Sequence, residues 1–143
     1  MPAGRPSWDA YFMAISRAVS TRSTCSRRSV GAVIVKGKRI LATGYNGAPA
    51  HTRHCDHSGD GDLLNGHCLR STHAEQNAIV QAAKYGIPIA GSTVYCTDRS
   101  CLTCAKLLIN AGVEKIVFEH EYLDGPAMEM LAEAGITVER LHP

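Results

Sequence analysis

Apolar residues recur at helical spacing near the start of the chain: Trp8, Tyr11, Phe12, Ile15 and Val19. Positions three or four residues apart share one side of a helix, so this pattern predicts a helix whose aromatic side chains lie in the core. Ser7 directly precedes the pattern and is a suitable N-cap. The polar, serine-rich stretch 22–29 ends the helix.

The rest of the chain alternates between short β-branched runs and longer helical patterns. The predicted strands are 30–35, 39–43, 93–97, 114–119 and 136–141, and a tight turn at 36–38 joins the first two. The predicted helices are 73–85, capped by Thr72, then 101–110 and 126–134. This order favours an α/β fold with a mixed five-stranded sheet and helices on both faces, hence three layers, α/β/α.

Size and charge narrow the function classes. A chain of 143 residues suits one domain, 1–143. The net charge is +2 and the basic residues are scattered, so long nucleic acid is not an expected partner, although a small phosphate needs only one or two cations. We see neither a signal-peptide pattern nor a segment apolar enough to cross a membrane, and we expect a cytoplasmic protein.

Two short motifs contain residue types that bind metal ions. His73-Ala74-Glu75 and Cys101-Leu102-Thr103-Cys104 offer three zinc ligands, His73, Cys101 and Cys104, and leave a fourth tetrahedral position open for water. Glu75 can face that position as a proton carrier without binding the metal. A lone Cys-x-x-Cys is often a redox pair or half of a structural zinc site, and a lone His-x-Glu is usually a polar helix start. Together, in this order, the motifs predict a catalytic zinc site.

The chain resembles the deoxycytidylate (dCMP) deaminase family of the zinc-dependent cytidine deaminase superfamily. The likeness rests on Gly44-Tyr45-Asn46-Gly47-Ala48-Pro49, on His73-Ala74-Glu75-Gln76-Asn77-Ala78-Ile79 and on Cys101-Leu102-Thr103-Cys104-Ala105-Lys106, and it extends from about Trp8 to Tyr122. It implies a cytidine-deaminase-like fold and hydrolysis of dCMP to dUMP and ammonia, which supplies thymidylate synthesis. Glu75 would move protons from water to ring N3 and to the departing amine.

The resemblance also implies substrate contacts. Asn46 would contact the deoxyribose, Tyr122 and His73 would flank the base, and the backbone near Ser100 would read the amine. Arg27 or Arg28 would bind the phosphate, with solvated surface arginines as the alternative. The family usually has proline where this chain has Ser100, and Arg99 before it would add a cation near the pocket rim.

A second zinc site is a further expectation. Residues 50–70 form a long polar segment without apolar periodicity, which requires a staple or a function. In some relatives, positions similar to Cys25, Cys55, His67 and Cys68 hold a structural zinc. Adjacent His67 and Cys68 are awkward joint ligands, so His57 or His54 can replace one of them, and free thiols with surface histidines are the alternative.

Regulation and assembly follow only from the resemblance. The family assembles as hexamers and is commonly activated by dCTP with magnesium and inhibited by dTTP. Gly44, Tyr45 and Gly47, together with the 55–68 segment, are where we expect an effector. The alternatives are a deaminase of another cytosine compound, such as modified dCMP, a nucleoside or single-stranded DNA, and a catalytically silent zinc- or nucleotide-binding protein.

Overall fold

Five strands form one mixed sheet in the computed structural model, which describes residues 4–142. They are β1 (Gly31–Lys36), β2 (Arg39–Tyr45), β5 (Thr93–Asp98), β6 (Lys115–His120) and β7 (Thr137–Arg140). Their order across the sheet is β2-β1-β5-β6-β7. β1 is antiparallel to β2 and to β5, whereas β5, β6 and β7 are parallel to one another. The predicted mixed five-stranded sheet is confirmed.

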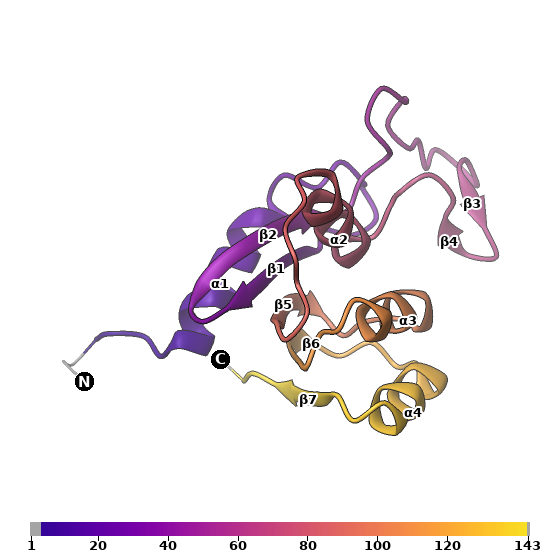
Figure 1. The fold of residues 1–143 in the computed structure, drawn as a ribbon. Coiled ribbons are helices and arrows are strands. Elements are labelled where there is room, and N and C mark those ends of the chain that lie inside the picture. Colours follow the sequence, from indigo (N-terminus) through magenta and orange to yellow (C-terminus); the bar gives the residue numbers. More distant parts are fainter. Residues whose placement is uncertain (1–3, 143) are drawn as a thin grey trace.

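Four helices cover the sheet: α1 (Trp8–Ser20), α2 (Ala74–Lys84), α3 (Leu102–Asn110) and α4 (Gly125–Glu133). α1 packs on one face, and α2, α3 and α4 pack on the other (Figure 1). The three predicted layers are therefore confirmed. Within residues 4–142, no helix has the length and apolar character that crossing a membrane requires.

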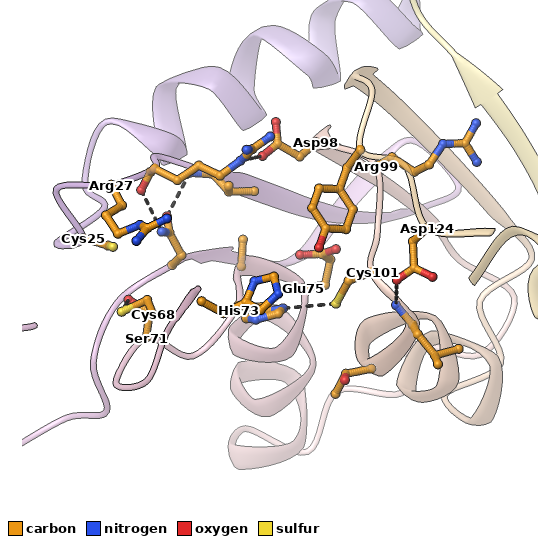
Figure 2. Close-up of a pocket in the computed structure, with 18 of the residues that line it drawn as sticks. Cys25, Arg27, Cys68, Ser71, His73, Glu75, Asp98, Arg99, Cys101 and Asp124 are labelled. Carbon is orange, nitrogen blue, oxygen red and sulfur yellow. Dashed lines mark hydrogen bonds and ion pairs between the residues drawn. The ribbon is translucent and has the colours of Figure 1, made fainter. Parts of the chain in front are cut away.

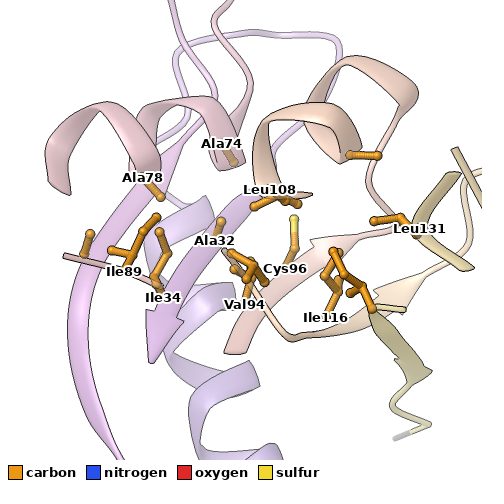
Figure 3. Close-up of a cluster of buried hydrophobic side chains, with 14 of the residues drawn as sticks. Ala32, Ile34, Ala74, Ala78, Ile89, Val94, Cys96, Leu108, Ile116 and Leu131 are labelled. Atoms are coloured by element: carbon orange, nitrogen blue, oxygen red, sulfur yellow. The ribbon is translucent and has the colours of Figure 1, made fainter. Parts of the chain in front are cut away.

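Alternation along β1 divides the core between the two faces. Ala32 and Ile34 point toward α2 and α3, where they meet Val94, Leu108 and other buried side chains (Figure 3). Val33 and Val35 point the other way, toward Phe12 and Met13 of α1. Successive residues of a strand face opposite sides, so a run of buried apolar residues is expected in a strand covered on both faces.

Helix α2 crosses β2 at very close range. A Cβ atom on Gly44 would lie 2.2 Å from the carbonyl oxygen of Ala74 and 2.4 Å from the backbone nitrogen of Ala78. Real side chains do not tolerate such distances, so only glycine lets the helix lie this close to the strand. Because α2 begins directly after His73, this contact also sets the position of His73 and Glu75 relative to the sheet.

Two details of the helices differ from the expectations. Trp8 and Tyr11 are 46% and 43% exposed rather than buried, because α1 faces the sheet through Phe12 and Met13. The cap of α2 is His73, not Thr72. The backbone of Thr72 is already paired with that of Gly47, while the His73 N–H donates to the side chain of Gln76 at 2.8 Å.

The long segment before α2 contains a small hairpin that the sequence analysis did not predict. Its strands are β3 (Leu63–Leu64) and β4 (His67–Cys68), which project from the body of the molecule (Figure 1). Asn65 and Gly66 connect them with φ of 52° and 78°, the left-handed values that an Asn-Gly hairpin turn adopts. Asp62 fixes the approach to the hairpin by accepting two hydrogen bonds from Arg53, at 2.7 and 2.9 Å.

Candidate active site

Two helix N-termini meet at the candidate metal centre. His73 is the N-cap of α2, Cys101 is the N-cap of α3, and Cys104 lies in the first turn of α3. His73 Nδ1 lies 3.2 Å from Cys104 Sγ and 3.4 Å from Cys101 Sγ. Ligand atoms on a tetrahedral zinc, with bonds of about 2.0–2.3 Å, are separated by roughly 3.5 Å, so these three side chains fit zinc.

The protonation states also suit a metal. The neighbouring Cys104 thiol and His73 stabilise the thiolate of Cys101 and lower its pKa to about 4. The proton shared with Cys101 raises the pKa of Cys104, and the hydrogen bond with Cys101 raises that of His73. One thiolate is thus prepared before zinc arrives, and zinc binding releases the remaining protons because its ligands coordinate in deprotonated form.

Glu75 lies next to this centre, on the first turn of α2 (Figure 2). It is only 5% exposed, and burial raises the pKa of its carboxyl, although its own backbone N–H and the nearby Ser100 hydroxyl act in the opposite direction. The Ser100 hydroxyl is buried and forms no well-aligned hydrogen bond with the residues described here. A buried carboxyl beside three zinc ligands has the position of a proton carrier.

A cavity of about 650 Å³ opens in front of Glu75, His73 and Cys101. Four of the predicted substrate-binding residues line it: Arg27, Arg28, Asn46 and Tyr122. Ser100 is 1% exposed and lies behind the wall formed by its neighbours Arg99 and Cys101. The predicted effector residues Gly44, Tyr45 and Gly47 are not part of this lining.

The arginines near the cavity are held in different ways. Arg27 donates from Nη2 to the carbonyl of Gly66 at 3.2 Å, at the tip of the β3–β4 hairpin. Arg28 donates from Nε to Asp98 Oδ2 at 2.5 Å, which raises the pKa of the guanidinium. The Arg99 guanidinium pairs with Glu121 and lies 4.3 Å from the centre of the Phe118 ring, directed away from His73 and Glu75 (Figure 2). Its charge is therefore compensated outside the cavity.

Asn46 braces the backbone that carries these arginines. Its Oδ1 accepts from the N–H of Val30 at 2.8 Å, and its Nδ2 donates to the carbonyl of Arg28 at 2.8 Å. Each end of the amide keeps one further hydrogen-bonding position, so a sugar hydroxyl can still be recognised there.

A second group of metal-binding side chains lies at the far side of the cavity. Its members are Cys25, Cys55, His57 and Cys68, whose ligand atoms are within 4.8 Å of one another. His57 Nε2 is 3.5 Å from Cys25 Sγ, and His57 Nδ1 lies 3.0 Å from the carbonyl of Gly61. A histidine that donates from one ring nitrogen to a carbonyl presents the other nitrogen to a metal.

The thiols of this group are unequal. Burial raises the pKa of Cys68, but hydrogen bonding with the side chain and backbone of Ser71, the backbone of Arg70 and the Cys55 side chain together lowers it to about 6. Burial and the neighbouring Cys25 and Cys68 raise the pKa of Cys55 to about 11. Three sulfurs and one imidazole nitrogen at these separations match a closed structural zinc site.

His67, the expected fourth ligand of this group, is not in it, and His57 takes its place. His67 and Cys68 are neighbours in β4, so their side chains leave the strand on opposite sides. His67 and Cys68 both line the cavity, but only Cys68 has its ligand atom within the group, and His54 is exposed.

Two carboxylates at the site were not predicted. Asp98 ends β5 and pairs with Arg28. Asp124 accepts from the N–H of Leu102 at 2.9 Å and from that of Ala127 at 3.0 Å, and thus caps α3 and α4 together. An aspartate just before the Gly-Pro start of α4 is a cap signal that sequence reading can find. Only the tertiary structure reveals its second helix and the partner of Asp98.

A His-x-Glu and a Cys-x-x-Cys motif at two adjacent helix N-termini, beside a cavity, define a zinc-dependent nucleobase deaminase site. The comparisons agree. Residues 6–120 match the family model described as the cytidine and deoxycytidylate deaminase zinc-binding region. The chain belongs to the cytidine and deoxycytidylate deaminase family.

Individual relatives resemble nearly the whole chain. ComE operon protein 2 of Bacillus subtilis is 44% identical over 96% of this chain and 72% of its own length. The deoxycytidylate deaminase of Saccharomyces cerevisiae is 40% identical over 96% of this chain, which spans only 46% of that enzyme. The dCMP deaminase of cyanophage S-TIM5, solved with dCMP and dUMP, is 35% identical with a TM-score of 0.85, covering 96% of this chain and 98% of that one.

Proposed function

We propose that this protein hydrolyses dCMP to dUMP and ammonia. The observation that carries the proposal is the placement of a buried Glu75 beside His73, Cys101 and Cys104, at a cavity that two arginines also line. The names of the yeast and cyanophage relatives, and the dCMP and dUMP in the cyanophage complex, support this substrate. We also propose that residues 1–143 act as one cytoplasmic deaminase domain.

The chemistry follows from the residues. Zinc held by the three ligands supplies Lewis acidity, which lowers the pKa of water from about 15.7 to about 7. Glu75 accepts a proton from water and delivers it to N3 of the cytosine while the water oxygen bonds to C4. It then takes the second proton from the new C4 hydroxyl and passes it to the amine, whose bond to C4 breaks. The products are dUMP and ammonia, with one water consumed.

The remaining cavity residues bind the substrate in this proposal. Asn46 contacts the deoxyribose, Tyr122 and the His73 ring flank the base, and the backbone next to Ser100 receives the amine. Arg28 binds the phosphate because its two Nη groups have no hydrogen-bond partner among residues 4–142, while Arg27 is engaged with the β3–β4 hairpin.

Ammonia release from dCMP by zinc-loaded protein tests the function, with deoxycytidine, dCTP and an oligonucleotide assayed in parallel. We expect turnover of dCMP that Glu75→Gln abolishes without loss of bound zinc. The exposed Glu129, on α4, provides the matched control, and Glu129→Gln keeps full turnover. Zinc without ammonia release from dCMP would refute the proposal, and turnover of another substrate would redirect it.

A second, structural zinc at Cys25, Cys55, His57 and Cys68 is part of the proposal. Metal analysis of the purified protein should give two zincs per chain. His57→Ala should reduce this to one, whereas His54→Ala, which changes an exposed histidine of the same loop, should leave two. One zinc per chain in the unchanged protein would contradict the second site.

The proposals on assembly and regulation rest on the resemblance to the family. By resemblance we propose a homo-hexamer that is activated by dCTP with magnesium and inhibited by dTTP, with the effector near Gly44, Tyr45 and Gly47. Sedimentation analysis tests the assembly. Initial rates at low dCMP, with each effector added, test the regulation, and rates that neither nucleotide alters would contradict it.

A further inference from the structure

The backbone around Arg28 is held in place before any substrate binds. Its carbonyl accepts from Asn46 Nδ2 at 2.8 Å and from the Ser23 hydroxyl at 3.1 Å. Two residues later, the N–H of Val30 donates to the same Asn46 side chain. The arginine therefore starts from a fixed point on the cavity wall, and only its side chain needs further restraint.

Asp98 provides that restraint. It ends β5, two residues before Ser100, and its carboxylate is only 13% exposed, whereas the Arg28 side chain is 53% exposed. Asp98 Oδ2 receives the Arg28 Nε–H at 2.5 Å. The guanidinium carbon lies 6.0 Å from the centre of the Tyr122 ring, at the outer limit of a cation–π contact. A rigid strand end thus holds one edge of the guanidinium, and an aromatic ring lies against its face.

The Arg28 atom that pairs with Asp98 determines which of its donors stay free for a ligand. Pairing through Nε occupies one edge of the guanidinium and leaves the two Nη groups, the fork that grips a phosphate with parallel hydrogen bonds. Both Nη groups are without a hydrogen-bond partner in the described part of the chain, and Arg28 lines the cavity together with Glu75. The side chain is thus oriented by its inner edge and open at its outer edge.

A carboxylate beside a phosphate-binding arginine has two opposing effects. It competes electrostatically with the phosphate, and it fixes the arginine in one conformation. The arginine side of this pair is half exposed, so solvent screens the repulsion between the Asp98 carboxylate and a phosphate bound at the two Nη groups. A free arginine loses much rotamer entropy when a ligand fixes it, so restraint in advance favours binding more than the competition opposes it.

We propose that Asp98 is a positioning residue that aims Arg28 at the 5′-phosphate and so sets the preference for a nucleotide over a nucleoside. This inference rests on the proposed function, because it assigns the phosphate of dCMP to Arg28. Asp98 does not itself touch the substrate.

Kinetics with dCMP and deoxycytidine test the role of Asp98 in the zinc-loaded protein. Asp98→Ala raises the KM for dCMP about tenfold, or about 1.4 kcal/mol, with kcat within about twofold and kcat/KM for deoxycytidine nearly unchanged. Asp98→Asn keeps an oxygen that accepts from Nε, so its KM for dCMP stays within about threefold of the parent value. Glu129→Ala, which removes an exposed acidic residue of α4, leaves every constant unchanged.

Two kinetic results would overturn the inference. An unchanged or lower KM for dCMP in Asp98→Ala would mean that the carboxylate is idle or competes with the phosphate. An equal loss with both substrates would mean a structural role only.

A binding measurement separates failure of this inference from failure of the proposed function. Calorimetric titration with dUMP and with deoxyuridine needs no turnover, and we expect Asp98→Ala to weaken only dUMP, about tenfold. Absence of ammonia release from dCMP by the unchanged protein refutes the function alone. Equal affinity of the unchanged protein for dUMP and deoxyuridine refutes the positioning role.

Discussion

Asp124 joins the start of α3, which carries Cys101 and Cys104, to the start of α4, and its removal is the most informative stability test. One carboxylate oxygen accepts from the first N–H of α3, and the other accepts from an N–H in the first turn of α4. The α3 bond is made at Leu102, directly after the ligand Cys101, so the same side chain stabilises the fold and orients the Cys-x-x-Cys motif.

The expected loss of stability follows from the number of helix caps that Asp124 forms. Loss of one aspartate cap costs about 1 kcal/mol, and Asp124→Ala removes two, so we expect the free energy of unfolding to fall by about 2 kcal/mol. For a protein of this size, that lowers Tm by roughly 7 °C. Asp124→Asn keeps one acceptor oxygen and should lose about half as much.

Thermal and denaturant unfolding of the zinc-loaded variants measure these differences, with Glu129→Ala on the exposed side of α4 as control. Zinc release to a chelator should be faster in Asp124→Ala, since the start of α3 loses its anchor. A destabilisation of Asp124→Ala no larger than that of the control, or equal losses in the Ala and Asn variants, would refute the double-cap reasoning.

Three further outcomes are expected. Gly44→Ala should lower the free energy of unfolding by about 1–3 kcal/mol and reduce kcat more than tenfold, because the new Cβ would lie 2.2 Å from a carbonyl oxygen of α2. Gly125→Ala is the control, since its Cβ meets nothing within 4 Å, and it should change neither quantity. Equal unfolding curves for the two variants would contradict this reasoning. Tyr95 donates to Asp9 at 2.6 Å, and burial together with this bond raises the pKa of the phenol. A raised pKa stabilises the fold at pH values below the unfolded pKa of about 10, so the difference in unfolding free energy between the parent and Tyr95→Phe should be constant at neutral pH and shrink as the pH rises above about 10. A difference that does not change with pH would refute the link. Leu108→Ala, at a side chain with 0% exposure, should lower the free energy of unfolding by about 2–5 kcal/mol, and a loss below about 1 kcal/mol in denaturant titration would contradict its core position.

Local patterns predicted most of the fold. β-branched runs and helical periodicity located the five strands of the sheet and all four helices described, because both depend on side chains close in sequence. The errors came from competition between local signals and tertiary contacts. Thr72 is a good cap by type, but its backbone pairs with Gly47, so His73 takes the role. Trp8 fits the apolar periodicity of α1, yet it lies at the edge of the contact with the sheet.

The candidate site also has a part that local sequence predicts and a part that only the tertiary structure decides. The motif spacing alone predicted His73, Cys101 and Cys104 as a group of candidate zinc ligands, which the structure brings together, because ligand chemistry is a property of residue type and short spacing. The role of Glu75 as proton carrier stays a prediction. Only the tertiary structure decided that His57 rather than His67 joins the second group, since adjacent residues of β4 point to opposite sides and Cys68 is the one that faces the other ligands. It also decided that Asp98 meets Arg28, 70 residues apart in the chain, because sheet pairing of β1 with β5 brings the two segments together.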